Sequence, residues 1–267
     1  MNKAIEINLG DEVVILNDMS SVLFVTGAGI SVDSNLPTYR GKGGLYTGNE
    51  ESIERLLSDH NMKHKPSVIW EHIFSGIEAM DSFEPNDAHR AIARMQEVVF
   101  RSCLFTQQVD NLHQKSGSIN VVDIHGNATQ AFCKNCIAVR GVKAAYIPMS
   151  EVDFTIKTKK GCPACSFCKS DLRPNIVPFG GELDSNKYNQ LLDFILEPVD
   201  IAFVIGTSLQ FPHIYQPVIE LAIAQGTRVV YVDPSKDCKP FALSGIAYHH
   251  IGKSATRFFD ENVKFLG

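Results

Sequence analysis

The stretch SVLFVTGAGIS, residues 21–31, joins a run of apolar and β-branched residues to a pair of glycines. Such a run is typical of a buried strand, and glycines after it allow a tight turn into a helix. They also let a phosphate approach the backbone amides at the helix N-terminus. The motif is incomplete as a dinucleotide-binding fingerprint, because Val32 stands where G-x-G-x-x-G has its third glycine. It therefore fits a ligand site and a tight turn without a ligand about equally well.

Similar runs recur along the chain and alternate with helical patterns. Apolar, strand-like runs occupy residues 98–106, 119–126, 199–208 and 227–234. Apolar residues at helical spacing predict helices over residues 85–98, with Asn86 or Asp87 as N-cap, and over residues 214–226. Strands that alternate with helices predict an α/β fold, a Rossmann-like, doubly wound parallel sheet with helices on both faces.

Five of the seven cysteines lie close together between residues 133 and 168. Two C-x-x-C pairs form a tetrahedral thiolate site, for which zinc is the usual metal, and four thiolates leave no open position for catalysis. A structural zinc is therefore predicted, with an iron–sulfur cluster or free buried cysteines as alternatives. One cysteine is surplus, and the spacing leaves open whether Cys162 or Cys168 is the spare one.

Two stretches interrupt the alternation of strands and helices, and both are predicted to be insertions that form a small lobe. The small lobe would consist of a helical module, residues 46–85, and a zinc-binding module, residues 131–172. The Rossmann-like domain would consist of residues 1–45, 86–130 and 173–267.

The composition is that of an ordinary globular protein, with 44% hydrophobic and 21% charged residues in a chain of 267. A net charge of −5 argues against a nucleic-acid partner. No apolar run reaches the ~18 residues of a membrane span, and the first residues lack a secretory signal pattern. The odd, clustered cysteines indicate a reducing compartment, so we expect a cytoplasmic protein without a membrane partner.

Polar residues follow several of the predicted strands, at the edge where open α/β sheets bind ligands. Amides and a carboxylate suit ribose and carboxamide groups, and a histidine suits proton transfer near neutral pH. The residues concerned are Gln107, Gln108, Asp110, His113, His125, Gly206, Thr207, Ser208 and Asp233. The alternative readings are structural: satisfied histidines, a helix cap at Thr207 or Ser208, and a turn at Asp233.

The order of these motifs resembles the sirtuin family of NAD-dependent protein deacylases, over nearly the whole chain. The shared pieces are GAGIS, the P-x-[FY]-R segment at residues 37–40, TQQVD, HG, the C-x-x-C pairs, LRP, FGG and GTS. The resemblance implies NAD as co-substrate, an acylated protein or peptide as partner, and structural zinc. It leaves the oligomeric state open.

The resemblance also implies residue roles. His125 would be the general base, with Gln107 and Asp110 at the nicotinamide ribose. The spacing to LRP in the family makes Cys162 the spare cysteine and Cys133, Cys136, Cys165 and Cys168 the zinc ligands. The remaining cofactor-binding residues would be Gly27, Ala28, Gly29, Ile30, Tyr39, Arg40, Gln108, Gly206, Thr207, Ser208, Asp233, Gly252 and Lys253. An unperturbed base would lose activity below pH ~6.5.

Several positions depart from the family pattern. Gln108 replaces an asparagine that contacts the nicotinamide ribose, and Asn35 replaces a glycine. Ile73 and Gly76 replace a tyrosine and an arginine found in members that remove acidic acyl groups, which favours neutral acyl groups such as acetyl. The glycine-rich residues 41–46 resemble the acid-acyl branch instead.

The sequence thus predicts an NAD-dependent protein lysine deacylase that releases nicotinamide and O-acyl-ADP-ribose. One alternative is an enzyme that cleaves NAD but passes ADP-ribose to a protein or to water, as an ADP-ribosyltransferase or NAD glycohydrolase does. A second alternative is a non-catalytic protein that senses NAD.

Overall fold

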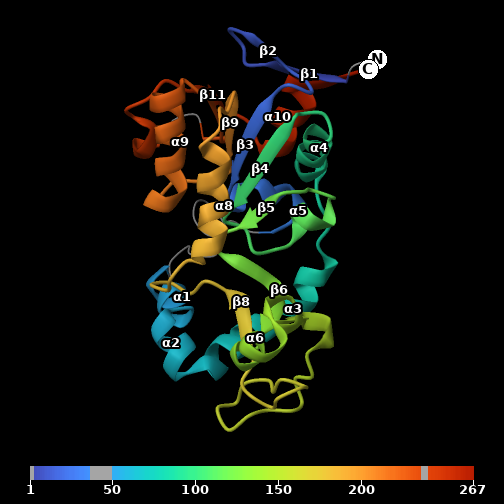
Figure 1. Ribbon diagram of the computed structural model, residues 1–267, viewed down its shortest axis with the longest axis vertical. Helices are drawn as coiled ribbons and strands as arrows, with labels where there is room; N and C mark the ends of the chain where they lie inside the picture. The colour runs from blue at the N-terminus through green and yellow to red at the C-terminus, as the bar shows by residue number, and fades with distance from the viewer. Residues whose placement is uncertain (1–2, 37–49, 236–239) are drawn as a thin grey trace.

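The computed structural model describes residues 3–36, 50–235 and 240–267. Tyr39, Arg40 and the glycine-rich residues 41–46 lie outside this range. Figure 1 shows two lobes along the long axis, with the larger sheet domain at the top and the small lobe below. Both chain termini lie at the top, far from the small lobe.

The central sheet of the larger lobe has six parallel strands among the described residues, in the order β11-β10-β9-β3-β4-β5. In chain order they are β3 (Ser21–Thr26), β4 (Arg101–Thr106), β5 (Val121–Asp123), β9 (Ile201–Ile205), β10 (Arg228–Val232) and β11 (His249–Ile251). Each predicted strand run supplies one of them. The predicted doubly wound parallel sheet is therefore confirmed.

Helices cover both faces of this sheet, as the burial of all six residues of β3 requires. Val22 and Phe24 pack on the face covered by α4 (Asp87–Gln96) and α10 (Ala255–Asn262). Leu23 and Val25 pack on the face covered by α8 (Ser185–Ile195) and α9 (Pro212–Gln225). Figure 1 shows the two pairs of helices on opposite sides of the strands.

The helix ends follow the local sequence signals. Asn86 caps α4, since its Oδ1 accepts from the amides of Ala88 and His89, at 3.0 and 3.3 Å. Helix α9 ends at Gln225, and Gly226 caps it in the left-handed conformation with φ of +67°. Both predicted helices are confirmed, and Asn86 is the cap of the two candidates.

A second, antiparallel sheet brings the two ends of the chain together, in the order β12-β1-β2. It consists of β1 (Ala4–Asn8), β2 (Val13–Leu16) and β12 (Val263–Leu266). Ile5 and Ile7 of β1 are fully buried and join the core under α4 and α10. The sequence patterns did not predict this sheet.

The small lobe combines helices with a three-stranded antiparallel sheet, β7-β6-β8. The strands are β6 (Gly126–Phe132), β7 (Tyr146–Pro148) and β8 (Arg173–Ile176). The helices are α1 (Glu50–Leu56), α2 (Asp59–His64), α3 (Pro66–Ser82), α6 (Lys134–Arg140), α7 (Val142–Ala145) and the 3-10 turn η2 (Met149–Glu151). Trp70 of α3 packs in a core with the cysteines and donates from Nε1 to the Leu172 carbonyl at 3.0 Å.

Strand β6 runs across the predicted start of the zinc-binding module at residue 131, whereas β8 begins directly after its predicted end at residue 172. The domain boundaries stay a prediction. Short elements complete the fold: the 3-10 turns η1 (Ala28–Ser34) and η3 (Phe241–Leu243), and α5 (Leu112–Lys115). Within the described residues, no helix is both long and apolar enough to cross a membrane.

Candidate functional site

The glycine turn after β3 and the GTS loop after β9 meet in backbone contact. The Gly29 amide donates to the Gly206 carbonyl at 2.8 Å, and the Gly27 amide donates to the Ile205 carbonyl at 3.1 Å. A Cβ on Gly29 would lie 2.5 Å from the Gly206 Cα, so no larger residue fits there. Strand order reverses between β3 and β9, and such a switch point is where open α/β sheets bind ligands.

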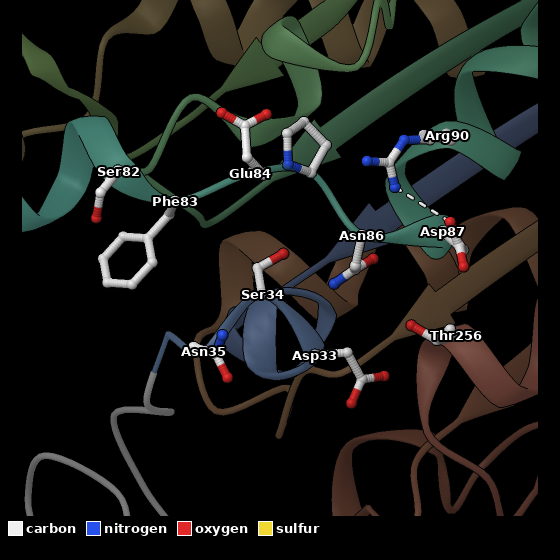
Figure 2. Close-up of a pocket in the computed structure, with 11 residues that line it drawn as sticks. Asp33, Ser34, Asn35, Ser82, Phe83, Glu84, Asn86, Asp87, Arg90 and Thr256 are labelled. Carbon is white, nitrogen blue, oxygen red and sulfur yellow. Dashed lines mark hydrogen bonds and ion pairs between the residues drawn. The ribbon is translucent and has the colours of Figure 1, made fainter.

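The turn η1 is held in shape by its own end and by α4. Asn35 adopts a left-handed φ of +64°, which asparagine tolerates better than most residues, so it can replace the family's glycine. The Asn86 Nδ2 donates to the Ile30 carbonyl at 2.8 Å. Figure 2 shows Asn86 beside η1, where residues 33–35 and 82–87 line an open pocket of about 400 Å³. This pocket contains none of the predicted site residues.

Asp110 lies buried beneath the glycine turn at the centre of a hydrogen-bond network. Its Oδ2 accepts from the Ser31 Oγ at 2.6 Å and from the Gln108 Nε2 at 2.9 Å. Its Oδ1 accepts from the Leu112 amide at 3.0 Å. The carboxylate is therefore tied to the glycine turn and to its own loop, and Gln108 folds back onto it.

Gln107 connects the loop after β4 with the loop after β9. Its Nε2 donates to the Thr207 Oγ1 at 2.7 Å. His113 lies behind this loop, almost fully buried, with its Nε2 3.0 Å from the Thr26 Oγ1. Burial lowers the pKa of His113 well below its usual value. Its position inside the core favours the structural reading of this histidine.

His125 lies at the end of β5, where the chain turns into the small lobe. The turn requires Gly126, which has φ of +91° and whose Cβ would lie 2.2 Å from the Asn175 carbonyl oxygen. Burial, followed by the charge of His213, lowers the pKa of His125 to about 4, against a smaller raising effect of the Gln107 backbone. The imidazole is thus neutral at pH 7 and able to accept a proton. His125 is therefore not the unperturbed base for which an acid limit near pH ~6.5 was expected.

The last predicted residues follow β10 and β11 at the same edge of the sheet. The Asp233 Oδ1 accepts from the Ser235 amide at 2.9 Å, which is the turn considered as its alternative role. Gly252 and Lys253 follow β11, and the Lys253 Nζ pairs with Glu261 at 2.8 Å. The side-chain charge of Lys253 is therefore already paired within the protein.

The cysteine sulfurs of the small lobe converge on one point. The Sγ atoms of Cys133, Cys136, Cys165 and Cys168 all lie within 4.8 Å of one another. Three of the separations are 3.4, 3.6 and 3.7 Å. A tetrahedral zinc with Zn–S of about 2.3 Å separates its sulfurs by about 3.8 Å, so the four thiolates fit a structural zinc. Cys162 is fully buried and stands outside the cluster.

Two residues of this region were missed by the sequence interpretation. Ser31 belongs to the quoted glycine motif, and its bond to Asp110 shows why a hydroxyl follows the glycines. His213 lies in the first turn of α9, with its Nε2 3.2 Å from the Nε2 of His125. The available signal was a histidine directly beyond the GTS loop, but only the folded chain brings it to His125.

Comparison with known proteins agrees with this geometry. A family model described as the Sir2 family matches residues 27–212. A curated relative, NAD-dependent protein deacylase 2 of Pseudomonas syringae pv. tomato, is 34% identical over 218 residues, which cover 79% of this chain and 83% of the relative.

Solved structures of Sir2 proteins share the fold. A triple mutant of Sir2 homologues in complex with 2'-O-acetyl ADP ribose aligns with a TM-score of 0.71 and 28% identity, covering 90% of this chain and 89% of that one. A complex of Sir2 with a p53 peptide and NAD+ aligns with a TM-score of 0.69 and 25% identity, covering 90% of each chain. Since the matched segment takes in the glycine turn, His125 and all four clustered cysteines, this chain belongs to the Sir2 family, the sirtuins.

Proposed function

We propose that this protein is an NAD-dependent protein lysine deacylase that transfers the acyl group to ADP-ribose and releases nicotinamide. One observation carries the proposal: the neutral, half-buried imidazole of His125 lies at the same sheet edge as the contacting glycine and GTS loops. A base beside a dinucleotide site is what the reaction needs. The family relatives are named for this activity.

Each group of site residues has a part in the reaction. NAD supplies an electrophilic ribose carbon, which the acyl oxygen of the lysine substrate attacks as nicotinamide leaves. Gly27, Ala28, Gly29 and Ile30 would bind the dinucleotide along the turn after β3. On the opposite loop, Gly206, Thr207 and Ser208 would hold its phosphates and adenosine side.

The proton transfer is assigned to His125. Its imidazole would accept the proton of a ribose hydroxyl, and that hydroxyl oxygen would then attack the carbon of the acyl group. Addition of water would break the bond from this carbon to the lysine nitrogen, so the amine leaves and the acyl group stays on ADP-ribose. Gln107 bridges to Thr207 and so holds the two loops that flank the ribose in a fixed spacing. Asp110 would position the ribose from beneath, because its carboxylate fixes both Ser31 and Gln108.

The zinc would be structural and bound by Cys133, Cys136, Cys165 and Cys168. The four thiolates fill a tetrahedral coordination sphere, so none is left for substrate. Three of them are buried in the same core as Trp70, which fixes α3 against the cluster. The metal therefore stabilises the lobe that faces the sheet domain.

Neutral acyl groups are the preferred substrates in this proposal. Ile73 is buried in the core of the small lobe, and a Cβ on Gly76 would meet open space. Neither position offers a cation to an acidic acyl group, and an unpaired carboxylate in an apolar pocket costs several kcal/mol. The cytoplasmic location and the lack of nucleic-acid and membrane partners stay predictions from the sequence.

A second candidate function is NAD cleavage with transfer of ADP-ribose to a protein or to water. Gln108 favours it, because its amide is bonded to Asp110 rather than free for the nicotinamide ribose. A longer side chain at this position changes how the ribose is held after nicotinamide leaves.

Incubating the pure protein with NAD and an acetyl-lysine peptide separates these functions by mass spectrometry. O-acetyl-ADP-ribose and deacetylated peptide are the expected products, with a succinyl-lysine peptide turned over more slowly. The His125→Ala variant serves as the matched control for background hydrolysis. ADP-ribose alone, or a modified protein, would support the second candidate instead. Unchanged NAD would support the NAD-sensing alternative.

A further inference from the structure

His213 stands directly against the residue assigned as the base. It lies in the first turn of α9, and its Nε2 is 3.2 Å from the Nε2 of His125, a hydrogen-bond distance. The two ring centroids are 5.5 Å apart, with the planes at 75°. Two imidazole nitrogens at this distance need one proton between them, so one ring donates and the other accepts.

The direction of this bond follows from the other contact of His125. The Gln107 backbone raises the pKa of His125, which is the effect of a carbonyl oxygen that faces a ring N–H. Because Nε2 faces His213, we assign the proton of neutral His125 to Nδ1, which leaves the lone pair on Nε2. His213 therefore donates its Nε2–H to the lone pair that would accept the ribose proton.

An aromatic side chain fixes the position of His213. The Phe211 ring stacks on His213 at 5.6 Å and 21°, and it meets His125 edge-on at 6.1 Å and 88°. The His213 side chain is only partly buried, so it has room to turn away from His125 towards solvent. Phe211 thus favours the position of the His213 ring beside His125, and the ring can still rotate towards solvent.

We propose that His213 is a positioning residue for His125: its N–H holds the base neutral and correctly oriented until the ribose hydroxyl replaces it. This inference rests on the proposed deacylase function, in which His125 is the base. His213 does not itself take the ribose proton; it turns aside when the hydroxyl bonds to the Nε2 of His125. His213 therefore affects the protonation state and the orientation of the His125 ring in the enzyme without bound substrate.

The charges around His125 support the same role. Burial is the main cause that lowers the pKa of His125, and the charge of His213 is the next. Burial also lowers the pKa of His213 itself. Among the described residues, the other groups that act on the His125 ring are neutral, the Phe211 ring and the Gln107 backbone. Loss of His213 should raise the pKa of His125, and burial should keep it below 6.5.

The test compares His213→Phe, which keeps a ring but no donor, with His213→Gln, which keeps an N–H donor but cannot carry charge. His249→Gln is the matched control, since His249 pairs with Asp11 and Glu12 at the far end of the sheet domain. The pKa of His125 is measured by NMR titration without NAD. The acid limb of kcat/KM, which reports free-enzyme pKa values, is measured in parallel.

His213→Phe is expected to raise the pKa of His125 by about one pH unit, the effect of one lost hydrogen bond. The acid limb of kcat/KM should move to higher pH by the same amount. The pKa of His125 in His213→Gln should lie nearer to the wild-type value. In the His249→Gln control it should equal the wild-type value. A cooperative thermal unfolding transition shows that each variant is folded. If His213→Phe does not fold, the pKa of His125 can still be compared between His213→Gln and the wild type.

The proposal is overturned if the pKa of His125 is the same in the wild type and in His213→Phe. It is also overturned if the pKa of His125 is the same in His213→Gln and in His213→Phe. Failure of the deacylase function itself has a different signature. In that case no acyl-ADP-ribose forms in any variant, while the NMR titration still reports whether His213 acts on His125.

Discussion

Truncating two neighbouring cysteines of the small lobe should give opposite signatures. Cys168 belongs to the sulfur cluster but is partly exposed, so its removal leaves little cavity. Cys162 is fully buried but outside the cluster, so its removal leaves a cavity and spares the metal site. We expect Cys168→Ala to lose zinc and zinc-dependent stability, and Cys162→Ala to lose stability alone.

The magnitudes differ as well as the causes. Loss of an outer-shell partner weakens a metal site by up to ~100-fold, so loss of a ligand should cost at least that much. A 100-fold weaker affinity corresponds to ~2.7 kcal/mol of folding stability at saturating zinc. For Cys162→Ala, removal of one buried atom should cost about 0.5–1.5 kcal/mol, as for a single buried methylene.

Metal content by mass spectrometry and urea unfolding, each with and without a chelator, measure both effects. With chelator present, Cys168→Ala and the wild type should have the same free energy of unfolding. Cys162→Ala should remain less stable than the wild type under both conditions. Full zinc content in Cys168→Ala, or its loss in Cys162→Ala, would show that the assignment of the four ligands is wrong.

The remaining predictions concern the site. His125→Ala should lower turnover by ~10²- to 10⁴-fold at saturating NAD. Its affinity for NAD, measured by calorimetry, should be nearly unchanged. An unaltered turnover would show that His125 is not the base. His113→Ala should instead lower the free energy of unfolding, because the ring is buried, and a large loss of turnover in folded protein would contradict its structural role. Gly126→Ala should destabilise by more than ~2 kcal/mol in urea, because strain at φ of +91° adds to a Cβ contact of 2.2 Å. Gly117→Ala, at φ of +88° in open space, carries the backbone strain alone, and equal losses for the two variants would refute the contact argument.

The parts of the fold that the sequence predicted are those with local causes. The run at residues 21–26 has six buried residues, and burial on both faces of a parallel strand produces such a continuous apolar run. Asn86 and Gly226 mark helix ends through contacts within a few residues of themselves. These signals depend on backbone geometry, so they can be read without knowing the rest of the chain.

Features that depend on distant partners were not predictable in the same way. Strand β1 pairs with β12 from the opposite end of the chain, and neither has a pattern that names its partner. His125 and His213 are separated by 88 positions, and Ser31 and Asp110 by 79. In each case the residue type was visible, but its significance came from a contact that only the folded sheet creates.

Gln108 shows how a departure from a family motif can be compensated locally. In the sequence, one additional methylene next to a predicted ribose site indicates altered chemistry. In the structure the longer side chain turns back, and its Nε2 donates to the Asp110 Oδ2, which also accepts from Ser31. The extra length is taken up by a bond to a residue two positions away, and the carboxylate gains a second side-chain donor on one oxygen. The longer side chain therefore supports the carboxylate beneath the glycine turn, and in the proposed site its amide would bond to Asp110 instead of to the ribose.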